Sequence, residues 1–356
     1  MGLSYRPVDW NRQKRIYDLT LLLVLVLSLS VFTGVSLWFS PNTTAETLII
    51  RGCSISGFLL LHVILCIGPL ARLDSRWLPL LYNRRHLGVT MFGLAGIHGV
   101  FSTIQFHALG NENPLVSLWT AYQRDYRIHA GGGWNLAQFP FEPFGVVALL
   151  ILGVLAVTSH DFWLRNLGAA FWKTLHLGGY AAYGLLVVHV GLGALQDERS
   201  PVYVVLLGLG FCTVTGVHLA AAWKEARMDR LEVAARNDGF VDAGSTSAIP
   251  EGRARVVVIS GQRIAVWRHH DRFHATSNVC RHQGGPVGEG CIVDGCITCP
   301  WHGWNYRPED GCSPPPFNER LATYAVRVFD GHVWVATSPP PHGEFVAHPK
   351  EGLPVS

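Results

Sequence analysis

Two short motifs, Cys280-Arg281-His282 and Cys299-Pro300-Trp301-His302, decide the fold of the C-terminal part of this chain. They read C-x-H and, after residues 283–298, C-x-x-H, and so offer two thiolates and two imidazoles. This donor set suits a two-iron cluster in which the cysteines hold one iron and the histidines hold the other. A single zinc ion accepts the same four side chains, although the C-x-H spacing is awkward for a tetrahedral ion. The motifs therefore favour an iron–sulfur cluster over zinc.

The residues around both motifs are glycines and short runs that predict β-strands. Glycine follows each ligand pair, and short β-branched runs separated by Asp/Gly turns predict strands near residues 255–259, 263–267 and 324–329. With the proline-rich stretch at 313–316, residues 235–338 resemble the Rieske [2Fe-2S] family, and in particular the ferredoxins of ring-hydroxylating dioxygenase systems. The resemblance implies an all-β domain. Its implied cluster ligands are Cys280, His282, Cys299 and His302.

The resemblance also makes the surroundings of the cluster informative. Gly285 and Trp301 stand where the respiratory type of Rieske protein has a pair of disulfide-bonded cysteines. Trp304 and Tyr306 stand where that type has a serine and a tyrosine that donate hydrogen bonds to cluster sulfur, so only the tyrosine is kept. Because fewer such bonds stabilise the reduced state less, we expect a reduction potential below that of the respiratory type.

The preceding part of the chain is apolar. The protein is 49% hydrophobic and only 15% charged, and its apolar residues form six runs that approach the length of about 20 residues needed to cross a bilayer. These runs are residues 17–39, 48–71, 87–106, 143–158, 172–195 and 201–223. The first run is too long for a signal peptide and has no small-residue cleavage site. We therefore expect a multi-domain protein in which an all-α six-helix transmembrane bundle precedes the all-β domain.

Charge indicates the topology. Lys and Arg gather at the N-terminus and in every second connection after it, so the positive-inside rule places the N-terminus and the C-terminal domain in the cytosol, with the chain in a bacterial inner (plasma) membrane. The expected parts are an N-terminal segment at 1–16, the membrane domain at 17–223, a linker at 224–250, the Rieske domain at 251–338 and a tail at 339–356.

The ionisable side chains within the apolar runs are almost all histidines. They are His62, His98, His176, His189 and His218. Imidazole is the usual axial ligand of b-type haem, whereas a lone membrane histidine more often makes hydrogen bonds between helices. Five of them without an accompanying carboxylate favour haem.

Further motifs indicate which of these histidines bind it. The order of Cys66-Ile67-Gly68-Pro69, Arg84-Arg85-His86, Trp172-Lys173-Thr174-Leu175-His176 and Val188-His189 resembles the ferric-reductase-like transmembrane family over residues 48–195. Within that family, the stretch is similar to the haem membrane subunit of bacterial methionine-sulfoxide reductase systems. The resemblance implies that His98, His176 and His189 are haem ligands. On one helix His176 and His189 would lie about 140° and roughly 20 Å apart, unless Gly178-Gly179 distorts the helix. His98 could therefore pair with either, and one haem is better supported than two.

Other modules lack a sequence signature. The chain has no strand–G-x-G-x-x-G–helix unit for a nicotinamide or flavin dinucleotide, and little chain follows the proline-rich stretch, which argues against an oxygenase domain with its own iron site. We therefore expect an oxidoreductase or electron-transfer component that passes single electrons between the cluster and haem, towards an acceptor at the outer face, with no catalytic side chain assigned.

Two alternatives stay open. One is a quinol-oxidising membrane module that feeds a cytosolic oxygenase or reductase, and the other is a non-enzymatic iron–sulfur redox sensor. The expected partners are the lipid bilayer and a cytosolic reductase, flavoprotein or ferredoxin, with quinone as a further candidate and no nucleic acid.

Overall fold

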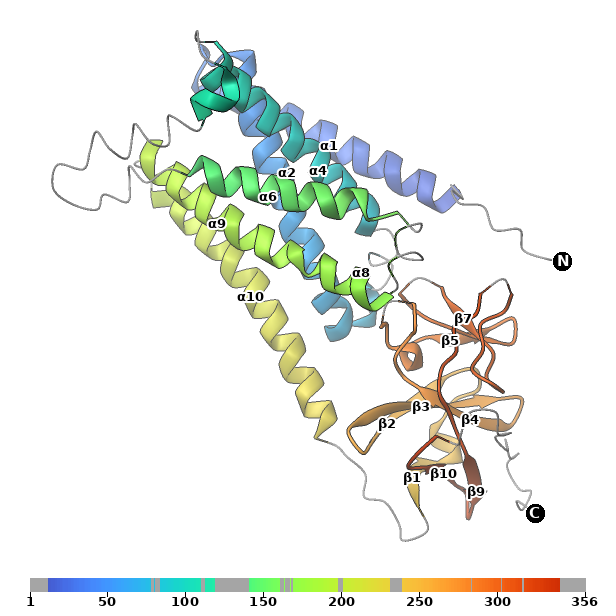
Figure 1. Ribbon diagram of the computed structural model, residues 1–356. Helices are drawn as coiled ribbons and strands as arrows, with labels where there is room; N and C mark the ends of the chain where they lie inside the picture. The colour runs from blue at the N-terminus through green and yellow to red at the C-terminus, as the bar shows by residue number, and fades with distance from the viewer. Residues whose placement is uncertain are drawn as a thin grey trace. The chain divides into compact units, whose positions relative to one another are not determined.

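The computed structural model describes residues 12–77, 80, 84–109, 113–118, 141–160, 163, 167, 169–197, 201–230, 239–282, 284–301, 303–315 and 317–339. These residues divide into a helical unit and a β unit, each described here by itself (Figure 1). The expected fold class, a helical membrane region followed by an all-β domain, is confirmed.

The helical unit follows the six apolar runs. Its α-helices are α1 Arg12–Phe39, α2 Ala45–Leu73, α4 Arg84–Thr103, α6 Glu142–Val157, α8 Ala169–His176, α9 Gly178–Asp197 and α10 Pro201–Asp229. Short η1 (Ser75–Trp77) follows α2, and the π-helical turn η2 (Ile104–Ala108) extends α4. Among the described residues, five segments are long and apolar enough to cross a membrane, whereas α6 is shorter. They are Arg15–Phe39, Ala45–Leu73, Arg84–Ala108, Phe171–Gly193 and Pro201–Arg227.

The helix number differs slightly from the expected six. The fifth run forms two helices, because α8 ends at His176 and α9 begins at Gly178. Glycine is a poor helix former because of its backbone freedom, and Gly178 and Gly179 occupy the start of α9. The break lies between His176 and His189, so spacing on one ideal helix does not describe these two residues.

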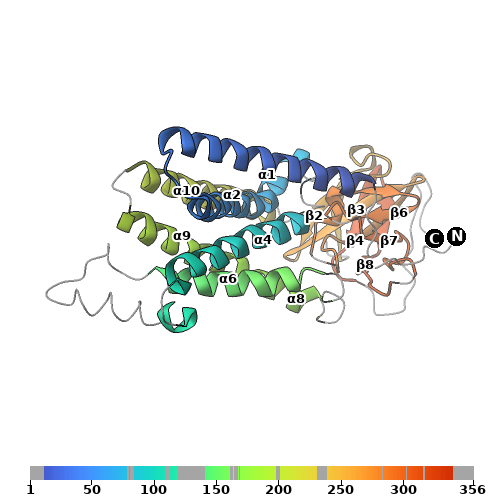
Figure 2. The same ribbon diagram turned by 90° about the horizontal axis from the view of Figure 1, so that it is seen from above.

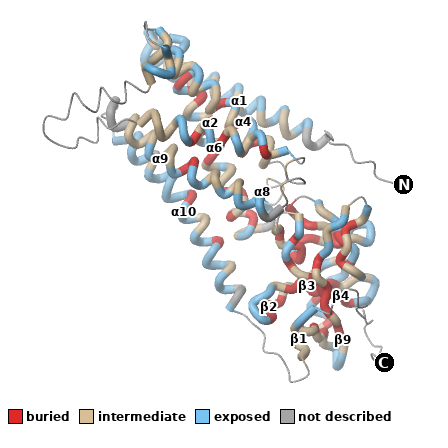
Figure 3. The backbone as a smooth tube through the Cα atoms, in the orientation of Figure 1, coloured by how far each residue is buried: buried red, intermediate tan, exposed pale blue. Residues whose placement is uncertain are grey.

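Packing within the helical unit centres on α6, which contacts both α4 and α9 (Figure 2). Ala148 of α6 and Ala182 of α9 are fully buried, and such small residues let helix backbones approach closely in a membrane. Positions along α1 and α10 are mostly exposed although apolar (Figure 3). Exposed apolar surface of this kind suits contact with lipid.

The β unit contains three antiparallel sheets among its described residues. Sheet one has the order β1-β10-β9, sheet two β2-β3-β4-β8 and sheet three β5-β6-β7. The strands are β1 Phe240–Ser245, β2 Ala254–Ile259, β3 Gln262–His269, β4 Arg272–Ser277, β5 Cys291–Val293, β6 Cys296–Thr298, β7 Asn305–Tyr306, β8 Thr323–Tyr324, β9 Val326–Phe329 and β10 His332–Ala336. Residues of the first two sheets share a buried core that includes Val241, Ile264, Phe273 and Val335.

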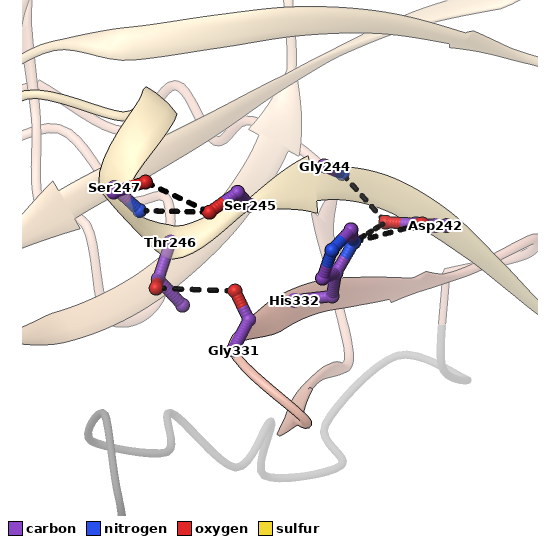
Figure 4. Close-up of polar contacts among 7 residues, drawn as sticks. All are labelled: Asp242, Gly244, Ser245, Thr246, Ser247, Gly331 and His332. Carbon is purple, nitrogen blue, oxygen red and sulfur yellow. Dashed lines mark hydrogen bonds and ion pairs between the residues drawn. The ribbon is translucent and has the colours of Figure 1, made fainter.

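Strand β1 lies inside the segment 224–250 that we expected to be a linker. Val241 and Ala243 alternate inward into the core, a pattern too short to stand out from the small polar residues around it. A bulge between Asp242 and Gly244 interrupts the pairing with β10. The Asp242 carboxylate accepts hydrogen bonds from Gly244 N–H (2.7 Å) and from Nδ1 of His332 (2.9 Å) there (Figure 4).

Candidate cluster and haem sites

Two loops with the same backbone pattern carry the predicted cluster cysteines. In the first, Cys280 N–H donates to the Gly285 carbonyl (2.8 Å) and Gly284 N–H donates to the Cys280 carbonyl (2.7 Å). In the second, between β6 and β7, Cys299 N–H donates to the Trp304 carbonyl (2.8 Å) and Gly303 N–H to the Cys299 carbonyl (2.9 Å). Both cysteines are buried. The matching loops therefore present two thiols in equivalent, water-excluded settings.

Tyr306 on β7 links its own strand to the first loop. Its hydroxyl accepts a hydrogen bond from Arg281 N–H (2.9 Å) and lies 3.2 Å from Cys280 Sγ. A cysteine sulfur that binds iron carries no proton, so the hydroxyl would be the donor of this hydrogen bond when the cluster is bound. Burial, and then the neighbouring Cys280 thiol, raise the pKa of Tyr306. The phenol therefore stays protonated and would donate to Cys280 once that sulfur binds iron.

Gly285 brings the two loops into contact. A Cβ atom at this position would lie 2.9 Å from Cys299 Sγ and 2.9 Å from the Trp301 ring. Only glycine fits this approach without displacing the sulfur or the indole. The residues that replace the respiratory disulfide thus pack against each other and against the predicted ligand Cys299.

His282 lies flat on Trp304, with ring centroids 4.3 Å apart and an interplanar angle of 6°. The indole N–H of Trp304 donates to Ser313 Oγ (3.0 Å), and its ring contacts Phe317 (4.3 Å between centroids). Trp304 therefore takes over a packing role beneath the predicted ligand His282, which the sequence did not reveal. The fourth predicted ligand, His302, lies outside the described residues, as does Pro316.

The donors that are described fit a Rieske cluster. Two cysteines and an imidazole come from paired loops, a glycine gives close access to one sulfur, and a buried hydroxyl lies 3.2 Å from the other. Zinc would use the same donors but would not require the tyrosine hydroxyl at sulfur.

In the helical unit, His98 of α4 and His189 of α9 face each other across 6.4 Å between ring centroids. Nδ1 of His98 lies 3.1 Å from the Ile50 carbonyl, and Nδ1 of His189 lies 2.9 Å from the Phe141 carbonyl. Because a carbonyl only accepts, each Nδ1 carries the proton and each Nε2 keeps its lone pair. A backbone carbonyl on the distal nitrogen is the usual arrangement for a metal-binding histidine.

The separation also suits a shared metal. With metal–nitrogen bonds of about 2 Å on both sides, two imidazoles on one ion have their centroids about 6 Å apart. Gly145 of α6 leaves room for one of these rings, because a Cβ there would lie 2.8 Å from both Cε1 and Nδ1 of His189. This pair of imidazoles fits the axial ligand set of a b-type haem. The spacing of histidines along the sequence left the partner of His98 undecided. It also did not indicate that Gly145 makes room for the His189 ring or that two backbone carbonyls bind the Nδ1 atoms.

The other membrane histidines differ from this pair. His176 bonds through Nδ1 to the Trp172 carbonyl (3.0 Å) and stacks on the Trp172 ring, and its Nε2 is buried with no hydrogen-bond partner among the described residues. His62 uses both nitrogens, bonding to the Phe58 carbonyl (2.8 Å) and the Tyr183 hydroxyl (3.1 Å).

His218 likewise bonds to the Val214 carbonyl (2.8 Å) and the Tyr180 hydroxyl (2.9 Å). His62 and His218 therefore act as satisfied structural histidines, whereas His176 keeps a free coordination position.

Comparison with known proteins finds a family for each part of the chain. Residues 239–325 match the model of the Rieske [2Fe-2S] domain, and residues 51–187 match that of the ferric reductase like transmembrane component. Both resemblances seen in the sequence are confirmed.

Individual relatives match either the membrane part or the Rieske part of the chain. The chain is 32% identical over 177 residues to the protein-methionine-sulfoxide reductase heme-binding subunit MsrQ of Azospira oryzae, covering 49% of this chain and 68% of that protein. It is 30% identical over 107 residues to the ferredoxin component of the alkene monooxygenase system of Xanthobacter autotrophicus, covering 30% and 88%. The anthranilate 1,2-dioxygenase ferredoxin subunit of Burkholderia cepacia is 34% identical over 79 residues, covering 22% and 73%.

Proposed function

Because this chain belongs to the ferric-reductase-like transmembrane family through residues 51–187 and to the Rieske [2Fe-2S] family through residues 239–325, we propose that it passes single electrons between a cluster and a membrane haem. Each of these groups, when bound, supplies a one-electron redox couple. The observation that carries the proposal is the facing pair His98 and His189, which is a candidate haem site in the helical unit, in addition to the candidate cluster loops of the β unit.

The proposed ligands have supporting contacts from the chain. Cys280 and Cys299 would hold one iron of the cluster, and His282 and His302 the other. His98 and His189 would be the axial ligands of the haem, each oriented by a backbone carbonyl. The Nδ1–H···O bonds fix the tautomer and raise the basicity of Nε2, which strengthens iron binding.

His176 is not needed for this haem in our proposal. Its buried, unpartnered Nε2 makes it the remaining candidate ligand should a second haem bind.

The orientation and route follow from charge and from the relatives. We place the β unit in the cytosol of a bacterial cell, on the side where basic connections gather. A cytosolic reductase, flavoprotein or ferredoxin would then exchange electrons with the cluster, and the acceptor would lie at the outer face. The haem-binding relative is named as part of a methionine-sulfoxide reductase, so an oxidised periplasmic redox protein is a fitting acceptor.

A second candidate runs the electrons in the opposite direction. Two relatives of the β unit are ferredoxin components of oxygenase systems, which favours a cluster that delivers electrons to a cytosolic oxygenase. Quinol in the membrane would be the source. Adding quinol to membranes under anaerobic conditions distinguishes the two, since only this candidate predicts that quinol reduces the cluster.

Optical and EPR spectra of the purified full chain test the proposal. We expect haem Soret and α bands together with the EPR signal of a reduced Rieske cluster in the same preparation. A preparation with a full complement of cluster but no haem would contradict the function and would leave a redox sensor as the better explanation.

A further inference from the structure

Two histidines and a glutamate meet at the turn between β3 and β4. They are His269 and His270, which end β3 and begin the turn, and Glu251, which precedes β2. Each offers a ligand atom within 4.8 Å of the others. Glu251 Oε1 lies 3.7 Å from His269 Nδ1, and the two imidazole rings are 4.1 Å apart between centroids.

Backbone pairing fixes the glutamate at this place. Residues 251–253 run alongside the end of β3, because Gly252 N–H donates to the Arg268 carbonyl (2.9 Å) and Arg268 N–H donates to the Arg253 carbonyl (3.2 Å). The Glu251 carboxylate then accepts a hydrogen bond from His270 N–H (2.7 Å). Its oxygen is thus held beside both histidines by groups that belong to the fold.

The turn itself departs from the other hairpins of the β unit. Three two-residue turns place a glycine second, as in Ser260-Gly261, Asp294-Gly295 and Asp330-Gly331, with positive φ at both residues. His270 and Asp271 have φ of 49° and 56° without any glycine. Left-handed backbone is uncommon for residues other than glycine, although Asp and His adopt it more readily than most.

The consequence of this turn is a change in side-chain direction. Neighbouring residues of a regular strand point to opposite faces, so His269 and His270 would be separated if the strand continued. The left-handed conformation at His270 instead brings its ring beside that of His269. A glycine would make the turn at lower cost but could not supply an imidazole.

We propose that Glu251, His269 and His270 bind one divalent transition-metal ion of the Zn²⁺ or Cu²⁺ class. Imidazole and carboxylate are the donors that these ions prefer. Around a tetrahedral ion, ligand atoms lie about 3.3 Å apart. Side-chain rotations that move the ligand atoms by roughly an ångström would bring the three residues to this spacing. Three protein ligands leave a fourth position for water.

Arg268 is the positive charge nearest to this site. Its Nε lies 3.7 Å from Glu251 Oε2, while its Nη2 lies 2.9 Å from Asp271 Oδ1. The guanidinium thus pairs with both carboxylates, and a cation at this site would share Glu251 with Arg268. Gly252 also accepts a hydrogen bond from Ile292 N–H of β5 (2.9 Å), and an ion here would therefore stabilise the segment that joins sheets two and three.

Titration calorimetry with ZnCl₂ on the tag-free full chain tests the site. We expect one tight equivalent of Zn²⁺, weakened by at least about tenfold in His270→Gly and in Glu251→Gln. His270→Gly removes a ligand but installs the residue that the turn geometry favours, so it should fold at least as well as the native chain. His332→Asn, at the turn between β9 and β10, is the matched control and should bind as the native chain does.

Stability and cluster absorbance give a second readout. Zn²⁺ should raise the temperature at which the visible absorbance of the cluster is lost, in the native chain and in His332→Asn but not in His270→Gly. Equal affinity in the native chain and His270→Gly would overturn the proposal. So would Zn²⁺ that bleaches the cluster equally in both, because the ion would then be binding at the cluster cysteines.

Discussion

Tyr306 is the residue whose hydroxyl sits nearest to a predicted cluster sulfur, 3.2 Å from Cys280 Sγ. A hydrogen bond to sulfur stabilises the more negative, reduced form of a cluster. A neutral hydrogen bond contributes about 1 kcal/mol, which for a one-electron couple corresponds to roughly 40 mV. We therefore expect Tyr306→Phe to lower the cluster midpoint by about that amount in an EPR-monitored redox titration.

A second tyrosine of the β unit provides the control. Tyr324 is also buried, but its hydroxyl donates to Gln262 Oε1 (2.9 Å). Tyr324→Phe should leave the midpoint unchanged. Equal shifts in both variants would mean that the effect comes from packing and not from the bond to Cys280.

The membrane histidines give the next prediction at this scale. His98→Ala and His189→Ala should each abolish haem binding, because each removes one of two facing ligands. His176→Ala should keep this haem, since its Nε2 is not directed to a histidine among the described residues. Haem content per protein, measured by the pyridine haemochrome assay, checks the three variants. Loss of all haem in His176→Ala with retention in His189→Ala would reverse our assignment.

These residues show how far a sequence alone can lead. The types of ligand followed from chemistry, because thiolate and imidazole at C-x-H and C-x-x-H spacing suit few metal centres. The pairing of His98 with His189 did not follow, because helical spacing gives a face and a depth but not the neighbouring helix. The carbonyls of Ile50 and Phe141, which fix both tautomers, come from distant parts of the chain.

At the scale of elements, helix α6 limits the position of His189. Gly145→Ala places a Cβ 2.8 Å from the imidazole ring, closer than ordinary van der Waals contact. The ring must then turn or move, and misplacing a metal ligand lowers affinity by about 10- to 100-fold. We expect a corresponding increase in haem dissociation, measured by transfer of haem to an acceptor protein.

Gly184→Ala is the matched substitution, because a Cβ at Gly184 of α9 would meet nothing within 4 Å. Alanine also favours helix over glycine by about 1 kcal/mol, so neither variant should unfold. Haem loss at the same rate in both would show that the contact between α6 and His189 does not position the ring.

Elements were predictable where a pattern was long. The six apolar runs, and strands β2 and β3 with their β-branched residues and flanking turns, are long enough for composition to indicate the element. Strand β1 was missed, and the break at Leu177 was foreseen only as a distortion that Gly178-Gly179 allows. Two glycines and two inward residues are weak local signals whose effect depends on tertiary packing.

At the scale of the whole molecule, the chain joins two units that each carry a proposed one-electron site. A ferredoxin needs no membrane helices, and a haem-binding helical bundle needs no iron–sulfur cluster. The presence of both units in one chain therefore calls for an explanation. We infer that their fusion makes electron transfer between the two centres intramolecular.

Flash photoreduction of the full chain in lipid nanodiscs tests this central claim most directly. After a flash injects electrons, the absorbances of haem and cluster should re-equilibrate with a first-order rate that does not change on tenfold dilution. His282→Ala, which should lack the cluster and keep the haem, should show no such phase. A re-equilibration rate proportional to protein concentration, or a phase that persists in His282→Ala, would contradict electron transfer between the two centres within one chain.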